Sequence, residues 1–389
     1  MKVCVISSKV CWQDAEGLWK TDGGFPIQMS AIASLFDEMD LLIIGSSPRS
    51  GGLSIPPKAT VIPLDQPYGA DMRRKISVFV RLPYYASNIA RRIGSADVVH
   101  LPVPGDIPTL GFLLALLLRK RLLVRYCGSW AKTAQTTWMN RIVKTGMKLL
   151  AGPRSVMLVT GEGSKPPAPK LHWIFATALS KSEVDAIRPN LERGLSNPPR
   201  LVYLGRLSQE KGIEVLLEAL SGLKRDGFCP VPRLTVAGDG PQRNKLERAV
   251  RKLGCGDLVH FSGQLTRTEM RQVLSDSDLC VQPSLTEGFS KAWLDAMAFG
   301  LPVLASNVGA AEAVIGAEGL RGWLTPPGDP TELARRLRII LKDVVDWPAL
   351  RTRCRAYAQV RTIEAWSARI GELCALQWNM RTDYGRLRQ

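Results

Sequence analysis

The chain has 389 residues, of which 45% are hydrophobic and 22% are charged, and its formal net charge is +17. This length exceeds what one hydrophobic core usually serves, so the sequence predicts a globular protein of two domains and excludes a disordered chain. The longest apolar run, 110–118, is about half as long as a membrane span and is followed by three cations. We expect a buried helix there.

Short apolar runs alternate with helical patterns through the first half of the chain. Strands are expected at 3–6, 41–44, 97–101, 122–125 and 156–160, and helices near 25–38, 109–118 and 136–150. This alternation predicts a parallel sheet with helices on both faces. The loop 20–26 contains Gly23 and Gly24, and glycine lets a backbone approach a phosphate closely. We therefore place an N-terminal, Rossmann-like domain at 1–190.

Two features of the sequence bear on the compartment in which the protein is found. Residues 1–9 form a strand pattern without the continuous apolar core of a secretory signal. The eight cysteines lack paired metal-ligand spacing, and free thiols in a reducing compartment explain them best. We expect a cytoplasmic protein.

The densest basic cluster is the segment 72–85, which interleaves cations with large apolar and aromatic side chains. Such a helix suits the surface of an anionic membrane. It equally suits an amphipathic helix that packs on a domain core with its arginines in solvent, and the sequence leaves both possibilities open. The chain contains no recognisable nucleic-acid module, so we expect no nucleic-acid partner.

The second half of the chain repeats the alternation of strands and helices. Strands are expected at 201–204, 234–237, 258–261, 279–282 and 303–305. A polar, proline-bearing stretch at 188–199 precedes the first of them and is expected to be a hinge. We therefore place a C-terminal Rossmann-like domain at 191–346. Two further helical patterns, 347–360 and 363–378, lie in the remaining segment, 347–389.

Two loops of the second half carry charged groups that suit one ligand. The strand 201–204 leads into a loop with Arg206 and Lys211. The planar guanidinium of the arginine and the compact ammonium of the lysine could together neutralise a diphosphate without a metal. The segment 286–303 holds Glu287 in a glycine-containing loop, then a helix start, then Asp295. Carboxylates accept hydrogen bonds from sugar hydroxyls, and the free N–H groups of a helix start bind phosphate. Together these groups suggest a sugar nucleotide.

These segments, with the Gly-Asp-Gly-Pro turn at 238–241, resemble the C-terminal half of glycosyltransferase family 4, and the resemblance covers most of 200–378. It implies a retaining enzyme with the GT-B fold, an α/β fold in which two Rossmann-like, doubly wound parallel-sheet domains face each other across a cleft. By the resemblance, the N-terminal domain binds the acceptor and the C-terminal domain binds the nucleotide-sugar donor. The helices of 347–389 would cross back towards the N-terminal domain.

The resemblance also implies roles for single residues. Glu287 would orient the transferred sugar, and Arg206 and Lys211 would offset the charge on the leaving diphosphate, so these three are the expected catalytic residues. The implied donor-binding residues come from several loops: Gly23, Gly24, Gly205, Gly263, Leu265, Gly288, Phe289, Ser290 and Asp295. No metal site is expected, and we interpret Asp276 and Asp278 as a helix exit rather than a metal motif.

Two positions depart from the family pattern. The family's second glutamate is Asp295 here, which shortens the reach of the carboxylate towards the ribose by one methylene. Where many relatives have a histidine after the fourth strand, this chain has Cys127, and a thiol cannot replace an imidazole as a charge-stabilising group. The acceptor-side candidates are five residues: His100, Arg125, Cys127, Ser129 and Trp130.

The implied function is transfer of a sugar, with retention of configuration, from a nucleotide-diphosphate donor to a saccharide or lipid-linked acceptor in polysaccharide or glycolipid biosynthesis. We favour a UDP-sugar over GDP-mannose as the donor only because UDP-sugars are the more frequent donors in the resembled family. No cofactor is expected, and contact with an anionic membrane at its cytoplasmic face would suit a lipid-linked acceptor. Two alternatives remain open: a non-catalytic nucleotide-sugar binder, which the two departures favour, and a nucleotide-sugar isomerase of the same fold.

Overall fold

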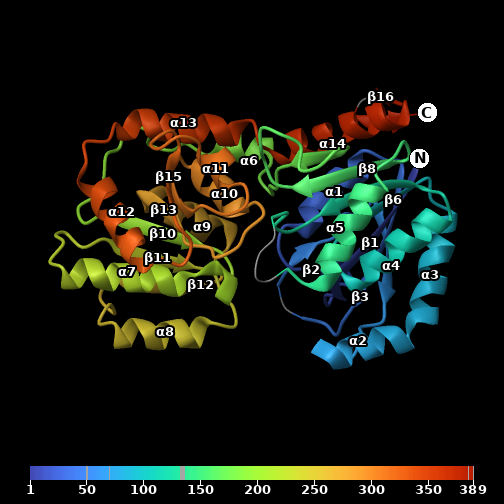
Figure 1. The fold of residues 1–389 in the computed structure, drawn as a ribbon, viewed down its shortest axis with the longest axis horizontal. Coiled ribbons are helices and arrows are strands. Elements are labelled where there is room, and N and C mark those ends of the chain that lie inside the picture. The colour runs from blue at the N-terminus through green and yellow to red at the C-terminus, as the bar shows by residue number, and fades with distance from the viewer. Residues whose placement is uncertain (50, 70, 132–135, 384, 389) are drawn as a thin grey trace. The chain divides into compact units, whose positions relative to one another are not determined.

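A computed structural model describes residues 1–49, 51–69, 71–131, 136–383 and 385–388. The chain divides into two compact units: unit 1 consists of Met1–Ala178 and Ile363–Gln389, and unit 2 consists of Leu179–Thr362. Unit 1 therefore contains both the blue and the dark red ends of the chain in Figure 1. The boundary lies at 178/179 and not at the expected 190/191, so residues 179–190 belong to unit 2.

Unit 1 contains one sheet and the helices that cover it. Its strands are β1 (Lys2–Gln13), β2 (Trp19–Thr21), β3 (Glu38–Gly45), β4 (Leu53–Ser54), β5 (Ala59–Leu64), β6 (Val98–Val103), β7 (Arg121–Tyr126), β8 (Ser155–Thr160) and β9 (Leu171–Ile174). Its helices are α1 (Phe25–Ser34), α2 (Asp71–Val80), α3 (Leu82–Gly94), α4 (Asp106–Leu117), α5 (Trp138–Leu149) and α14 (Ile363–Trp378). A small hairpin, β16 (Arg381–Asp383) and β17 (Arg386–Arg388), follows α14.

Strand β1 lies inside this nine-stranded sheet and pairs in parallel with β3 and β6. β5 continues the sheet beyond β3, and β7, β8 and β9 continue it beyond β6, so the chain winds outwards from β1 in both directions. The five strands expected in this half are confirmed. β2, β4, β5 and β9 were not expected, because they are short or, in β5, contain a proline.

Two hydrophobic clusters fill the two faces of the unit 1 sheet. Val3 and Val5 of β1 pack in one cluster with α1 and α14, whereas Cys4 and Ile6 pack in the other with α3, α4 and α5. Figure 1 shows these last three helices together on one side of the sheet. Alternate side chains of a strand point to opposite faces, so a strand covered on both faces must be apolar throughout, as the start of β1 is.

Two helices of unit 1 differ from the sequence expectation in what they expose. α4 was expected to be buried, yet only one side of it is, and Leu113 and Leu117 point into solvent. The basic segment 72–85 was considered as one helix, and the structure divides it into α2 and α3. Among the described residues, no helix is long and apolar enough to cross a membrane.

Unit 2 contains a second sheet. Its strands are β10 (Arg200–Leu204), β11 (Arg233–Ala237), β12 (Val259–Gly263), β13 (Leu279–Gln282), β14 (Val303–Ser306) and β15 (Gly322–Thr325). Its helices are α6 (Lys181–Ala186), the short 3₁₀-helix η1 (Gln209–Lys211), α7 (Ile213–Arg225), α8 (Arg243–Lys252), α9 (Arg267–Asp276), α10 (Lys291–Ala298), α11 (Ala311–Ile315), α12 (Pro330–Lys342) and α13 (Trp347–Gln359).

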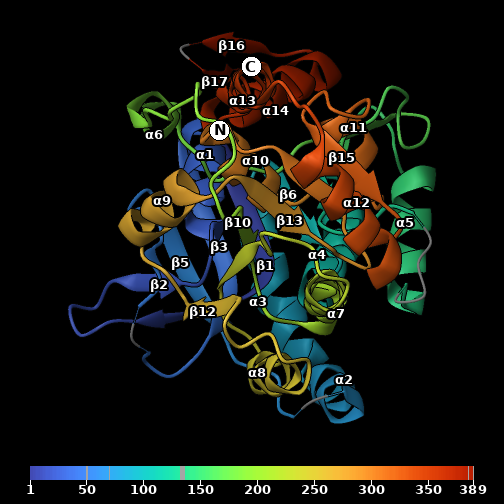
Figure 2. The same cartoon turned by 90° about the vertical axis from the view of Figure 1, so that its left-hand side faces the viewer.

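The six strands of unit 2 are all parallel and lie in the order β12-β11-β10-β13-β14-β15. Figure 2 shows β12, β10, β13 and β15 in this order across the sheet. The direction of winding reverses between β10 and β13, and open parallel sheets bind ligands at the carboxyl ends of the strands on either side of such a reversal. The five strands expected here are confirmed, and the sixth, β15, was missed.

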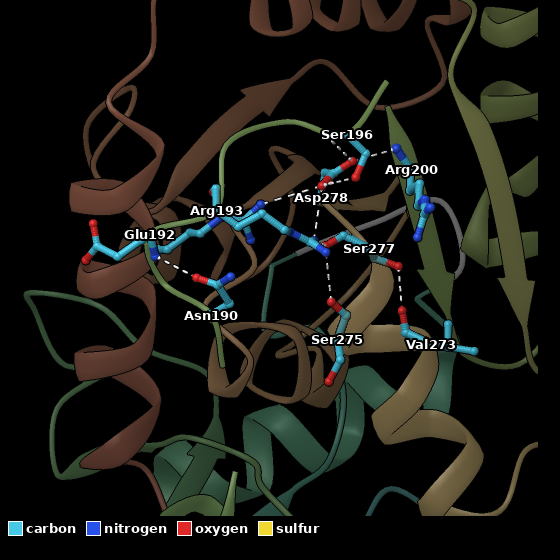
Figure 3. A network of polar contacts seen from close by, with 10 residues as sticks. Asn190, Glu192, Arg193, Ser196, Arg200, Val273, Ser275, Ser277 and Asp278 are labelled. Carbon is cyan, nitrogen blue, oxygen red and sulfur yellow. Dashed lines mark hydrogen bonds and ion pairs between the residues drawn. The ribbon is translucent and has the colours of Figure 1, made fainter. Parts of the chain in front are cut away.

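The stretch 188–199 was expected to be a hinge, but polar contacts fasten it to unit 2 (Figure 3). Asp278, fully buried before β13, accepts hydrogen bonds from the backbone N–H of Ser196 at 3.2 Å, its hydroxyl at 3.1 Å and the backbone N–H of Arg200 at 2.8 Å. The guanidinium of Arg193 lies 3.1 Å from the same carboxylate, and that of Arg351 in α13 lies 3.7 Å away. Asp278 is thus a structural residue. α9 ends at Asp276, so the interpretation of Asp276 and Asp278 as a helix exit is confirmed.

The two C-terminal helices were expected to return together to the N-terminal domain, and the structure corrects this for α13. α13 stays in unit 2, where the Arg355 guanidinium donates hydrogen bonds to the backbone carbonyls of Ala298 and Val184. α14 belongs to unit 1, where Trp366 and Ile370 pack in the same cluster as α1.

Candidate functional site

The loops that follow β10 and β13 meet at the reversal point of the unit 2 sheet. The backbone N–H of Leu285 donates to the carbonyl of Glu210 at 2.8 Å. Gly212 has a φ of +64°, and a Cβ added there would lie 2.1 Å from the carbonyl oxygen of Pro283. Only glycine permits this approach, so the two loops that carry the expected catalytic residues are held against each other.

Lys211 and Glu287, from these two loops, are joined directly. The Lys211 ammonium forms an ion pair with the Glu287 carboxylate, and both side chains are partly buried. The other carboxylate oxygen of Glu287 accepts a hydrogen bond from the backbone N–H of Gly288 at 3.3 Å. Partial burial strengthens an ion pair because less water screens it. The structure therefore brings together two of the three expected catalytic residues.

Arg206, the third, lies one residue after Gly205 and is exposed. Its backbone carbonyl accepts a hydrogen bond from the Tyr203 hydroxyl at 3.0 Å, and burial raises the pKa of that phenol well above its usual range. The Arg206 guanidinium forms no ion pair with any residue that the structure describes. Tyr203 thus holds the loop from within the sheet, while the cation stays accessible to an anion.

Glycines in neighbouring loops support this arrangement. Gly238 has a φ of +141°, and a Cβ there would lie 1.9 Å from the carbonyl oxygen of Gly205. The loop after β14 was missed by the sequence analysis, although its Gly309 has a φ of +60° and a Cβ there would lie 2.2 Å from the Glu287 carbonyl. The backbone N–H of Ala310 donates to the carbonyl of Gly288 at 2.9 Å. A glycine soon after an expected strand was the signal that could have found this loop.

The expected donor-binding residues Gly263 and Leu265 lie at the end of β12 and just after it. Gly263 has a φ of +71°, and its carbonyl accepts a hydrogen bond from the backbone N–H of Gly238 at 2.8 Å. Leu265 lies two residues after Gly263 and is half-buried. The guanidinium of Arg243, which was not predicted, lies beside these residues, 3.2 Å from where a Cβ of Gly263 would be.

The start of α10 carries three more of the expected donor-binding residues. Gly288 and Phe289 precede Ser290, which is the N-cap of α10, and no described side chain caps this helix end. Phe289 and Ser290 are buried, and the Phe289 ring packs against Trp293 with centroids 5.8 Å apart. Uncapped backbone N–H groups at a helix start can bind a phosphate.

Asp295 lies in α10, half-buried. Desolvation raises the pKa of its carboxyl to about 6, although the cations Lys291 and Arg267 pull it in the opposite direction. A carboxylate with a raised pKa gains from any hydrogen-bond donor that a ligand supplies, because the donor stabilises the charged form.

Asp295→Asn should alter the pH dependence of the stability of unit 2. In the folded protein the carboxyl holds its proton up to about pH 6, whereas the ordinary value is 3.8. Its contribution to stability is therefore highest below pH 4 and falls as the pH rises towards 6. We expect the free energy of unfolding of the asparagine variant to exceed that of the wild type by more at pH 7.5 than at pH 4.5, as measured by urea denaturation. An equal difference at both values would contradict the assignment.

Two of the five acceptor-side candidates are buried in unit 1. His100 is completely buried in β6, its Nδ1 lies 2.9 Å from the carbonyl oxygen of Leu123, and burial lowers its pKa to about 3. Arg125 is also buried, donates to the side-chain oxygen of Gln28 at 3.0 Å and lies over the Trp366 ring. Neither side chain reaches the surface, so the structure does not support direct contact with an acceptor.

The other candidates of unit 1 lie at the carboxyl ends of its strands. Cys127 is exposed directly after β7, and Ser129 follows it, half-buried. The Trp130 indole donates to the carbonyl of Pro167 at 3.1 Å. Gly23 is exposed with a φ of +74° and open space where a Cβ would be, and Gly24 is the N-cap of α1. Of the candidates in this half, Cys127 and Gly23 are thus the most accessible.

Metal-ligating side chains do not gather in the part of the chain that the structure describes: no three of its histidines, cysteines and carboxylates form a group that could hold an ion. The expectation of metal-independent chemistry therefore stays a prediction.

Comparison with known proteins identifies similar chains. Residues 190–361 match the family described as glycosyl transferases group 1. The chain is 30% identical over 284 residues to the alpha-D-kanosaminyltransferase of Streptomyces kanamyceticus, covering 68% of this chain and 72% of that protein. In several other curated relatives, the matched region covers less than half of the relative's length.

Two solved structures share the fold of this chain. The sucrose-phosphate synthase of Thermosynechococcus elongatus matches with a TM-score of 0.73 and 21% identity over 97% of this chain and 99% of that one. The Anabaena protein HepE, solved in complex with UDP, matches with a TM-score of 0.71 and 18% identity over 97% of this chain and 100% of that one. At these identities the likeness establishes the fold, which is α/β with two Rossmann-like domains, as expected.

Proposed function

Since this chain belongs to the glycosyl transferases of group 1, we propose that it is a retaining glycosyltransferase that moves a sugar from a nucleotide-diphosphate donor to a saccharide or lipid-linked acceptor. The observation that carries the proposal is the Lys211–Glu287 ion pair at the reversal point of the unit 2 sheet. A ligand with both hydroxyls and phosphates suits a site in which a carboxylate and a cation lie side by side.

Each group of this site has a part in the proposed reaction. As the bond between sugar and phosphate breaks, negative charge gathers on the departing diphosphate, and Lys211, Arg206 and the N–H groups at the start of α10 would stabilise it. Glu287 would accept hydrogen bonds from the sugar hydroxyls. Asp295 would accept them from the ribose, and the turn at Gly263 and Leu265 would lie against the base.

The donor class remains part of the proposal. We favour a UDP-sugar over GDP-mannose, and we propose transfer without a metal ion because two side-chain cations already stand in the loops that would face the diphosphate. The acceptor would bind unit 1, near Cys127. A role in polysaccharide or glycolipid synthesis follows if the acceptor is a saccharide or a lipid-linked saccharide.

We also propose that unit 1 contacts a membrane through α2. Ile76, Phe79 and Val80 of this helix are exposed, as an interfacial helix requires. Two of its neighbouring cations are occupied within the protein, since Arg74 pairs with Asp106 and Arg81 with Asp65. Arg73 of the same helix is exposed and forms no ion pair with a described residue, so charge as well as apolar contact would attract α2 to an anionic bilayer.

A thermal-shift experiment tests the donor site. Purified protein with UDP at 100 times its dissociation constant should gain about 2.7 kcal/mol of stability, which corresponds to roughly 5–10 °C in melting temperature for a domain of this size. We expect the same shift in EDTA and in Mg²⁺, and smaller shifts with GDP, ADP and dTDP. A larger shift with GDP would change the donor class, and no shift with any nucleotide would contradict the proposed function.

A non-catalytic nucleotide-sugar binder is the second candidate. It is favoured by Cys127, which takes the position where the resembled family has a histidine, and by the shorter carboxylate of Asp295. A protein of this kind would show the UDP shift but would neither transfer nor hydrolyse the donor sugar.

A further inference from the structure

A surface cavity of about 490 Å³ lies at the amino edge of the unit 1 sheet, away from the edge that carries Cys127. Its walls come from the residues just before β6, from the start of β7, from the residues just before β8 and from the end of α14. The proposed reaction uses none of these residues. The cavity is therefore separate from both the donor site and the acceptor side.

The walls of this cavity are strongly basic. Four cations, Arg119, Lys120, Arg121 and Arg154, face a single acid, Asp97. The Lys120 ammonium donates to two backbone carbonyls, both at 2.8 Å. Among the described residues none of the three arginines forms an ion pair, and Arg154 only donates a hydrogen bond of 3.4 Å to a backbone carbonyl. Three guanidinium groups thus remain for an anionic ligand.

Two further features of the walls point to a ligand. Arg119 follows the end of α4 with a φ of +51°, a position that glycine usually occupies because a Cβ is unfavourable there. The Trp378 side chain is buried in the wall, and its indole N–H finds no acceptor among the residues that the structure describes. An arginine at a left-handed position and an unpaired buried donor both cost stability, which a ligand would offset.

Exposed leucines flank the cavity-lining segments along the chain. They lie at the ends of the three helices that reach this edge, α4, α5 and α14, and each is 42–82% exposed: Leu117, Leu118, Leu149, Leu150 and Leu376. Leu118 directly precedes Arg119, and Leu376 directly precedes the cavity-lining pair 377–378. A soluble anion would not require an apolar rim, whereas a bilayer offers phosphate beside hydrocarbon.

We propose that this cavity binds the phosphate headgroup of an anionic phospholipid while the flanking leucines enter the adjoining acyl region of the bilayer. Guanidinium groups hold phosphate oxygens in pairs, and basic residues are attracted to the negative surface potential of an anionic leaflet. The proposal does not depend on sugar transfer, and it concerns another surface than the α2 contact. α2 lies at the carboxyl edge of the unit 1 sheet, where Arg74 pairs with Asp106, so one bilayer would meet only one of the two surfaces at a time.

Co-sedimentation with vesicles tests the proposal. Wild-type protein should bind vesicles of phosphatidylcholine with 30% phosphatidylglycerol more tightly than vesicles of phosphatidylcholine alone. The double variant Arg119→Gly/Arg154→Ala should bind the anionic vesicles on the order of 30-fold more weakly, at roughly fivefold per arginine. Because glycine removes the cost of a side chain at the left-handed position 119, the Arg119→Gly single variant should melt at or above the wild-type temperature, so weaker binding of this variant cannot be attributed to unfolding.

Arg248→Ala/Arg251→Ala is the matched control, because both arginines are exposed on α8 of unit 2 and the same charge is removed. It should bind anionic vesicles like the wild type, and an equal loss in this control would overturn the proposal by reducing the effect to net charge. Leu149→Ser/Leu376→Ser should weaken vesicle binding at 0.5 M salt, where screening leaves mainly the apolar part.

Inorganic phosphate separates the lipid from a soluble anion. If 10 mM phosphate raises the melting temperature of the wild type but not of Arg119→Gly/Arg154→Ala, while no vesicle is bound, the cavity takes a soluble anion and the proposal is overturned. The shift caused by UDP should be the same in the wild type and in this variant. Failure of the lipid proposal and failure of the donor-site proposal are therefore distinguishable.

Discussion

Replacement of Lys211 by alanine should lower the rate of sugar transfer by about 100- to 1000-fold, which is the usual loss when one group that stabilises a transition-state charge is removed. The Lys211 ammonium is held at the site by its ion pair with Glu287 and by the close packing of Gly212 on the Pro283 carbonyl. The measurement is the initial rate of transfer, or of donor hydrolysis, with the nucleotide sugar whose base gives the largest thermal shift.

Lys245→Ala is the control for this experiment. Lys245 also belongs to unit 2 and pairs with Glu214 at 2.7 Å, but both side chains are largely exposed, so its removal should leave the rate unchanged. Glu287→Ala should cost a similar factor to Lys211→Ala. Because the two side chains touch, the double variant should lose less than the product of the two single losses. If the Lys211→Ala variant kept more than half of the wild-type transfer rate, the catalytic role proposed for Lys211 would be wrong.

Replacement of Asp278 by alanine should destabilise unit 2 by about 3–5 kcal/mol, because it leaves buried charge and buried N–H groups without a partner. Arg351 is almost completely buried, and burial already lowers its pKa to about 10. The backbone N–H groups of Ser196 and Arg200 would lose their acceptor as well. Urea denaturation followed by tryptophan fluorescence measures the loss.

Asp276→Ala provides the comparison, since this aspartate lies two residues earlier and is exposed at the end of α9. Its replacement should change the unfolding free energy by less than about 0.5 kcal/mol. If both variants lost the same amount, the buried network in Figure 3 would not be what stabilises the segment 188–199.

The alternation of strands and helices was predictable because most strands of unit 2 are short apolar runs between turn residues. β10, β13 and β14 are buried along nearly their whole length, so their composition alone marks them. β15 was missed because it begins with a glycine, which weakens a strand pattern. β4 has two residues and is exposed, and so short a strand has no pattern to detect.

The residue types of the candidate site were readable from the sequence, and the ligand that they bind stays a prediction. Charged residues next to glycines in loops after strands indicated a phosphate and hydroxyl ligand, and the structure places those loops at the reversal point of the unit 2 sheet. The same approach misjudged His100, because a histidine in a strand shows from sequence neither which face it occupies nor how deeply it is buried.

The sequence by itself determined the α/β class, five of the six strands of unit 2 and the loops that carry Arg206, Lys211 and Glu287, because these depend on residues within a few positions of one another. Only the tertiary structure decided which of those side chains meet. Lys211 and Glu287 are 76 positions apart, and Arg193 and Asp278 are 85 apart. Contacts over such separations depend on strand order and on the packing of every intervening element, and no local pattern of the sequence contains that information.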